Sequence, residues 1–108
     1  MTTTMNIPLH HDGGAAREVR KVDVMFRIHE QIEGKVHWFA VHESPFGGVP
    51  VLAHYRSGIK VDLLAPGASL AKGKPDYRDM AKRAIRVLLA THGGDKVAAK
   101  LDSFDRLN

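Results

Sequence analysis

Apolar and polar residues alternate along most of the segment from Val19 to Leu64. A period of two is typical of β-strands that bury one face. Three short turn signals, each containing glycine, interrupt the alternation at residues 33–34, 44–48 and 57–58. The pattern therefore predicts four strands, at residues 19–31, 35–43, 49–56 and 59–64. Connections this short favour an antiparallel meander.

The remainder of the chain predicts two helices. Residues 65–75 contain two prolines and two glycines and are expected to form a loop. Asp76 is a good N-cap for a helix over residues 77–92, whose apolar residues recur at helical spacing. Gly93 and the glycine after it would end that helix. A second helix is expected at residues 95–107.

An antiparallel sheet with one apolar face needs a cover, and the two helices are the elements available for it. We therefore predict an α+β fold of order β-β-β-β-α-α, a four-stranded antiparallel meander with two C-terminal helices packed on one face. The long first strand leaves open a curled, partly closed sheet, or a dimer in which two sheets meet. Residues 17–108 would form this single domain, and residues 1–16 would form a flexible leader.

Composition excludes several classes of protein. The chain has 108 residues, a net charge of +4 and no cysteine, so disulfide frameworks, thiolate metal sites and cysteine nucleophiles are excluded. No apolar run approaches the roughly 20 residues that a membrane-spanning helix needs. We expect a soluble, cytoplasmic protein with no membrane contact. The serines lack the sequence context of a catalytic nucleophile, so we expect no catalytic residue and no cofactor.

The register of the first two strands decides which side chains share a face. A three-residue loop ending at Gly34 would pair Ile28 with Trp38 and Phe26 with Ala40, which places Trp38 beneath the helices. The opposite, helix-free face would then carry the candidate binding residues: Arg27, His29, His37, Phe39, Val41, Leu52, His54 and Arg56.

This face suggests three interpretations. An exposed apolar patch of Phe39, Val41 and Leu52 favours a protein partner or a homodimer. Alternatively, Phe39 could stack a base while arginine and histidine hold phosphates, as in sheets that bind single-stranded nucleic acid. An ordinary solvated face is the third interpretation. We predict a small basic binding domain without catalysis that acts through its helix-free sheet face, by contact with a protein partner or by self-association.

Histidine supports a further alternative, a small metal-dependent enzyme. If Ala40 pairs with Val51, then His29, His37 and His54 form a row across the sheet. Three imidazoles at cross-strand spacing could share a zinc ion. If Ala40 pairs with Ala53 instead, the row is broken.

Overall fold

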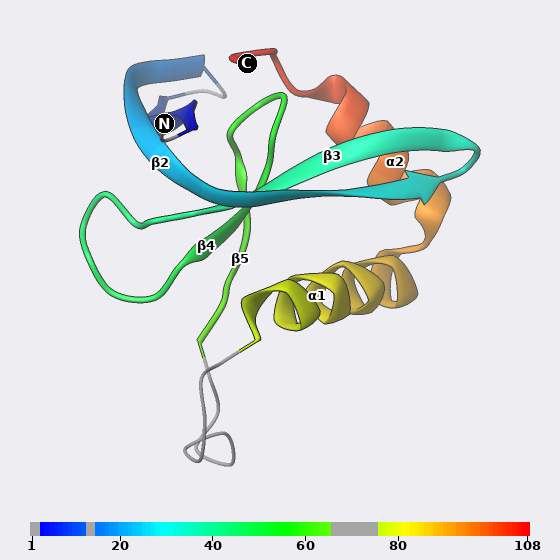
Figure 1. Ribbon diagram of the computed structural model, residues 1–108. Coiled ribbons are helices and arrows are strands. Elements are labelled where there is room, and N and C mark those ends of the chain that lie inside the picture. Colours follow the sequence, from blue (N-terminus) through cyan, green and yellow to red (C-terminus); the bar gives the residue numbers. More distant parts are fainter. Residues whose placement is uncertain (1–2, 13–14, 66–75) are drawn as a thin grey trace.

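The computed structural model describes residues 3–12, 15–65 and 76–108. They form a five-stranded antiparallel sheet followed by two helices (Figure 1). The strands lie in the sheet in their sequence order: β1 Thr4–Asp12, β2 Ala15–Ile32, β3 Lys35–His42, β4 Val51–His54 and β5 Lys60–Leu63. The helices are α1, Tyr77–His92, and α2, Gly94–Ser103. The predicted α+β class, with a meander and two C-terminal helices, is confirmed, and the sheet has one strand more than predicted.

The additional strand corrects the expectation of a flexible leader over residues 1–16. Within that segment β1 pairs antiparallel with the first half of β2, from Thr4 opposite Asp23 to Asp12 opposite Ala15. Met5 and Ile7 lie two residues apart, on the same face of the strand, and both are buried. Their burial and the pairing of the backbone explain why this segment is a strand. The loop expected at residues 65–75 lies, apart from Ala65, outside the described residues.

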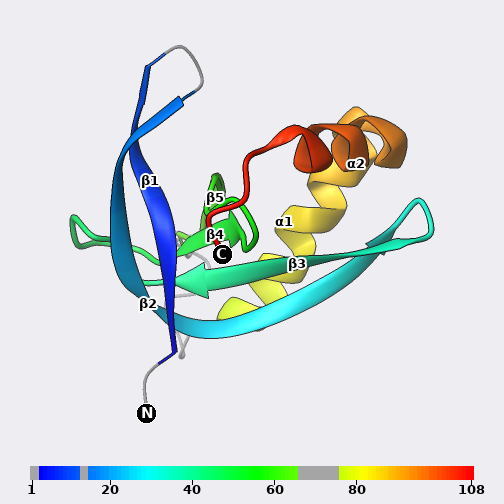
Figure 2. The same cartoon turned by 90° about the horizontal axis from the view of Figure 1, so that it is seen from above.

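The long strand β2 serves two parts of the sheet. Its first half pairs with β1 and its second half with β3, and an irregularity in the β2–β3 pairing lies between Val24 and Phe26. Figure 2 shows the strong curve of β2 that results. Met5, Ile7 and Val22 pack with Ala40 and Ala53 in a core separate from the one under the helices. The curled sheet that the sequence left open is therefore the arrangement observed.

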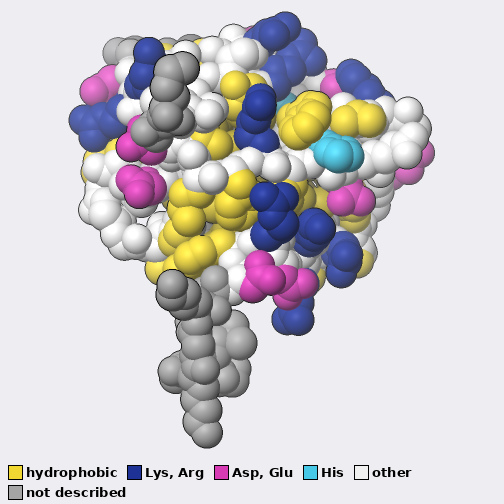
Figure 3. Space-filling model, in the orientation of Figure 1, with side chains coloured by type: hydrophobic (Ala, Val, Ile, Leu, Met, Phe, Trp, Pro, Cys, Tyr) yellow, Lys and Arg dark blue, Asp and Glu magenta, His cyan; other side chains and the backbone are white. Residues whose placement is uncertain are grey.

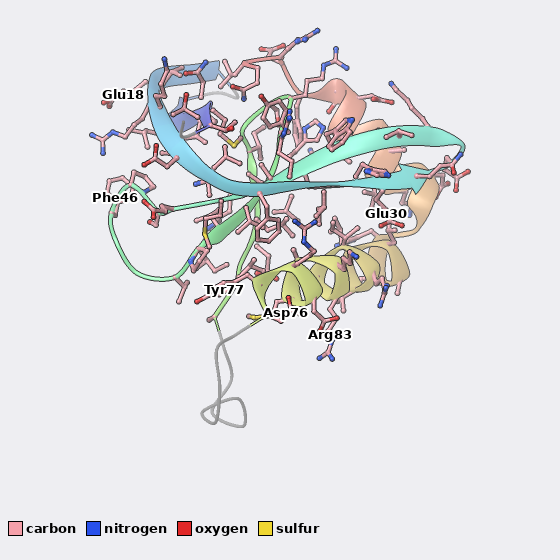
Figure 4. All side chains as sticks on the ribbon, viewed as in Figure 1. Glu18, Glu30, Phe46, Asp76, Tyr77 and Arg83 are labelled. Carbon is pink, nitrogen blue, oxygen red and sulfur yellow. The ribbon has the colours of Figure 1, made fainter. Side chains whose placement is uncertain are left out.

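The helices cover the other face of the sheet. Asp76 caps α1 by accepting a hydrogen bond from the backbone N–H of Asp79 at 3.1 Å (Figure 4). Gly93, with φ of 85°, ends α1, so the predicted bounds of this helix are confirmed. The second helix stops at Ser103, four residues earlier than predicted. The main core joins both helices to three strands: Ile28, Ile32, Phe39, Val41, Leu52, Leu64, Ala81, Ile85, Val97 and Leu101.

The turn between β2 and β3 differs from the predicted one. Glu33 and Gly34 both have positive φ, 51° and 77°, as the two-residue type I′ turn requires. Ile32 consequently pairs with Lys35, and the register places Phe39 opposite Ile28 and Trp38 opposite His29. The predicted pairing of these strands is wrong by one residue, which moves every side chain of β3 to the other face.

The pairing of β3 with β4 follows the second of the two registers considered. Ala40 lies opposite Ala53, and Phe39 lies opposite His54. His54 therefore shares the helix-covered face with Phe39 and His37, because residues two apart on a strand point the same way.

Candidate functional site

Five of the eight predicted binding residues lie on the face that the helices cover. Phe39, Val41 and Leu52 have no exposed surface and belong to the main core, and His37 and His54 are also buried. The expectation that these five lie on a helix-free surface is wrong, because the type I′ turn reverses the faces of β3. The other three, Arg27, His29 and Arg56, are exposed.

Trp38, which we expected beneath the helices, is 46% exposed on the opposite face. The guanidinium of Arg27 lies over the Trp38 ring, 5.6 Å from its centroid, and over the Tyr55 ring at 5.2 Å. The His29 ring is tilted against Trp38 with the two centroids 5.0 Å apart. Cations at these distances are attracted to the π face of an aromatic ring. We call Arg27, His29, Trp38 and Tyr55 the aromatic–cation surface.

A cavity of about 530 Å³ adjoins this surface. The backbone N–H of Tyr55, just after β4, donates to the carbonyl of Trp38 in β3. Residues 35–37 of β3 extend beyond this hydrogen bond and beyond the residues that pair with β4. Side chains from both faces of β3 meet there beside the C-terminal residues. The lining includes Arg27, Trp38 and Tyr55 together with Lys35, Val36, His37, His54, Arg56, Asp102, Arg106 and Asn108. In Figure 3, exposed hydrophobic and histidine side chains lie beside one another over β3, with Lys and Arg side chains around them.

The charge of this cavity is predominantly positive. Arg27, Lys35, Arg56 and Arg106 line it, and Asp102 is the one residue with an acidic side chain in the lining. Asp102 accepts a hydrogen bond from Lys35 Nζ at 2.9 Å, which lowers the pKa of this carboxyl below its usual range. Lys35 already neutralises Asp102, and Arg106 Nε donates to the main-chain oxygen of Asn108 at 2.6 Å. Arg27, Arg56 and the remaining N–H groups of Arg106 are left to attract an anionic ligand.

Two buried histidines, His37 and His54, are among the lining residues of the cavity, and both are uncharged at neutral pH. Burial lowers the pKa of His37, and burial together with the nearby His37 and Arg56 lowers the pKa of His54 to about 4. Both imidazoles are therefore neutral at pH 7. His54 Nδ1 lies 2.8 Å from Ser57 Oγ. His37 Nε2 is buried and has no hydrogen-bond partner among the described residues, which costs free energy in the folded protein.

The row of three histidines does not form. His29 contacts Trp38 on the exposed face, whereas His37 and His54 lie on the helix-covered face. In the part of the chain that the structure describes, no group of three histidine or carboxylate side chains is arranged to hold a metal ion. The zinc hypothesis required His29, His37 and His54 on one face of the sheet, and they lie on two.

Sequence reasoning missed seven residues of this site: Lys35, Val36, Trp38, Tyr55, Asp102, Arg106 and Asn108. The available signal for Trp38 was the pair Glu33–Gly34, which also fits a two-residue turn. For Asp102 and Arg106 the sequence carries no such signal, because they reach the cavity only through the packing of α2 and the segment after it.

Comparisons of the chain with protein-family models, curated proteins and solved structures give no match. The function must therefore be argued from the residues of the site. No helix within the described ranges is long and apolar enough to cross a membrane.

Proposed function

We propose that this protein is a small binding domain that holds single-stranded nucleic acid on the aromatic–cation surface and in the adjoining cavity. The observation that carries the proposal is Trp38, a half-exposed indole between Arg27 and His29 at the mouth of a cavity with positive charge. Proteins that bind single strands combine aromatic rings, on which bases stack, with cations that follow the phosphates.

Each part of the site has a role in this proposal. A base stacks on the exposed part of the Trp38 ring, which is worth about 1–3 kcal/mol in such complexes. Arg56 and Arg106 bind phosphates of the same strand, since they line the cavity and Lys35 already engages Asp102. Arg106 does so with the N–H groups that remain beside its hydrogen bond to the main-chain oxygen of Asn108.

A protein partner or a homodimer, our first expectation from the sequence, has lost its main support. That expectation depended on an exposed patch of Phe39, Val41 and Leu52, and all three side chains are in the core. The surface that replaces this patch is aromatic and cationic, which suits a nucleic-acid strand better than a second basic copy of the same chain.

The test uses fluorescein-labelled single-stranded DNA and RNA of about 12 nucleotides, a length within the usual range for one small domain. Fluorescence anisotropy measures the Kd at several salt concentrations. Trp38→Ala should weaken binding by about 5- to 150-fold, which corresponds to the loss of one stacked base. Phe46→Ala is the matched control, because Phe46 is an aromatic residue 81% exposed on the loop between β3 and β4 and does not line the cavity.

Two further readouts are specific to this site. Trp38 is the single tryptophan of the chain, so a base stacked on it should quench the intrinsic fluorescence of the protein. Replacing Arg56 and Arg106 by glutamine should reduce the slope of log Kd against log salt, by about one unit for each lost phosphate contact. Equal affinities for Trp38→Ala and Phe46→Ala, or no binding at low salt, would overturn the proposal. If the protein forms a concentration-dependent dimer and Trp38→Ala abolishes it, the site serves self-association instead of nucleic-acid binding.

A further inference from the structure

A second cavity lies between β5, α1 and α2, and it shares no residue with the one beside Trp38. Its volume is about 430 Å³. Leu88 comes from α1, Val97 and Leu101 come from α2, and Ile59 and Val61 come from β5 and the residue before it. We call this cavity the β5 groove.

The β5 groove lies beside β5, one of the two edge strands of the described sheet. β5 is the last strand in the sheet order, so β4 is its one partner among the described strands. Ile59, Lys60 and Val61 all line the groove. Ile59 directly precedes β5, and the β4–β5 pairing shifts between Asp62 and Lys60, so Val61 lies at an irregularity of this edge strand. An edge strand presents backbone N–H and C=O groups that can pair with another extended chain.

The side chains of the groove combine an apolar surface with positive charge. Ile59, Val61, Leu88, Val97, Leu101 and Phe104 supply the apolar part. Lys60, His92, Lys96 and Lys100 supply the basic part, and no acidic residue is among the lining residues. Lys100 Nζ lies 5.8 Å from the centroid of the Phe104 ring, so one cation is held directly beside the apolar surface.

We infer that the β5 groove binds an extended acidic peptide of a partner protein, which adds a strand to β5. The peptide backbone pairs with the edge of β5 and the apolar side chains of the paired segment enter the groove. Carboxylates on the residues that flank the paired segment meet Lys60, Lys96 and Lys100. Strand addition of this kind draws affinity from main-chain hydrogen bonds and specificity from pockets for alternate side chains. A second copy of the chain is a poor occupant, because its own edge carries Lys60 and would be repelled.

The experiment uses a fluorescein-labelled peptide of about nine residues in which glutamate alternates with valine, long enough to span β5. Anisotropy measures its Kd. Changing Lys96 and Lys100 to glutamate should weaken binding by about tenfold or more. Lys82 and Arg86 provide the control: they are exposed on α1, do not line the groove, and give the same change in net charge when replaced by glutamate. This control should change the Kd far less.

Two measurements identify the mode of binding. Amide hydrogen exchange in Lys60–Leu63 should slow in the complex, because the peptide pairs with these residues. A peptide of the same sequence with alternate backbone nitrogens methylated should bind much more weakly, since it loses donors to the edge. Circular dichroism of each variant checks that it is folded, and Trp38→Ala should bind the peptide as the unchanged protein does, which separates this inference from the proposed function.

The contrary outcomes are equally specific. The inference is overturned if the peptide shows no saturable binding, or if the groove variant and the control bind it equally well. It is also overturned if methylation of the peptide backbone has no effect and dodecanoate displaces the peptide, because the groove would then be a site for an apolar anion.

Discussion

Trp38 and Phe39 are neighbours in the chain and lie on opposite faces of β3. Trp38 is 46% exposed beside Arg27, whereas Phe39 has no exposed surface and packs in the main core. Both are aromatic and both follow a predicted strand pattern, so their residue types do not distinguish them. In the register that accompanies the two-residue turn at Glu33 and Gly34, Phe39 lies on the helix-covered face and Trp38 on the opposite face.

Replacing these two aromatic residues by alanine should have unequal effects on stability. Phe39→Ala leaves a cavity in the core and should lower the free energy of unfolding by about 3–5 kcal/mol. Trp38→Ala removes a half-exposed ring and should lower it by about 1 kcal/mol or less. Urea denaturation followed by circular dichroism measures both. A larger loss of stability for Trp38→Ala than for Phe39→Ala would support the alternative register, in which Trp38 is buried.

The buried histidine His54 predicts that the protein loses stability in mild acid. Its pKa is about 4 in the folded protein and 6.5 in an unperturbed chain. As the pH falls from about 6.5 to 4, the unfolded chain binds a proton at this position that the folded protein does not. The free energy of unfolding should therefore decrease over this window, by up to about 1.4 kcal/mol per pH unit for one histidine. The lowered pKa values of His37 and His42 act in the same direction.

Urea denaturation at pH 7, 6 and 5 measures this dependence. His54→Gln keeps a polar side chain beside Ser57 and should flatten the dependence on pH. His92→Gln is the control, because His92 is exposed at the end of α1. If His54→Gln and His92→Gln both keep the full slope, His54 is not a source of the acid sensitivity.

Among the secondary-structure elements, α1 and the β2–β3 hairpin show what local sequence signals can and cannot predict. Asp76 and Gly93 act within one turn of the helix ends, so they predicted the bounds of α1 correctly. A hairpin containing Glu33 and Gly34 is compatible with two loop lengths. The choice between them depends on which face of β3 fits against α1 and α2, and this is not encoded within the turn.

Two turn glycines, Gly58 between β4 and β5 and Gly34 between β2 and β3, give a matched pair of substitutions. Gly58 and Gly34 have similar positive φ values of 72° and 77°, so alanine strains the backbone equally at both, by about 1–2 kcal/mol. A Cβ at Gly34 meets no atom within 4 Å, whereas one at Gly58 would lie 2.9 Å from the Cα of Ile7 in β1. Gly58→Ala should therefore destabilise the protein by at least about 2 kcal/mol more than Gly34→Ala, as overpacking typically does.

Thermal or urea denaturation of the two variants measures the difference. Equal losses of stability would show that the turn after β4 does not press against β1. Such a result would also contradict the close approach of Gly58 to β1, which closes this side of the curled sheet.

On the scale of the whole molecule, Asn108 links the two ends of the described chain. Its side-chain oxygen accepts from the N–H of Asn6 at 2.7 Å, and its amide donates to the carbonyls of Asn6 and Tyr55 at 2.9 and 2.7 Å. The N–H groups of Leu107 and Asn108 donate to the carbonyl of Arg56. One side chain thus joins β1 to the segment after β4 and lies beside the cavity that Trp38 borders.

Removing this link should loosen β1. Asn108→Ala eliminates three side-chain hydrogen bonds and should lower the free energy of unfolding by about 2–3 kcal/mol. Amide hydrogen exchange at Asn6 should become faster than in the unchanged protein. Asp105→Ala, a change at an exposed residue of the same segment, serves as the control. Unchanged exchange at Asn6 would mean that β2 alone holds β1 in place.

The sequence by itself determined the class of fold, the meander of β2 to β5 and the bounds of α1, because these depend on periodicity and capping within a few residues. The tertiary structure decided which face of β3 is buried, since Trp38, Phe39, Ala40 and Val41 are all apolar and alternation therefore favours neither face. It also decided the role of β1 and the composition of the candidate site. Packing of strands and helices distant in sequence brings those residues together, and no local pattern of residues records that packing.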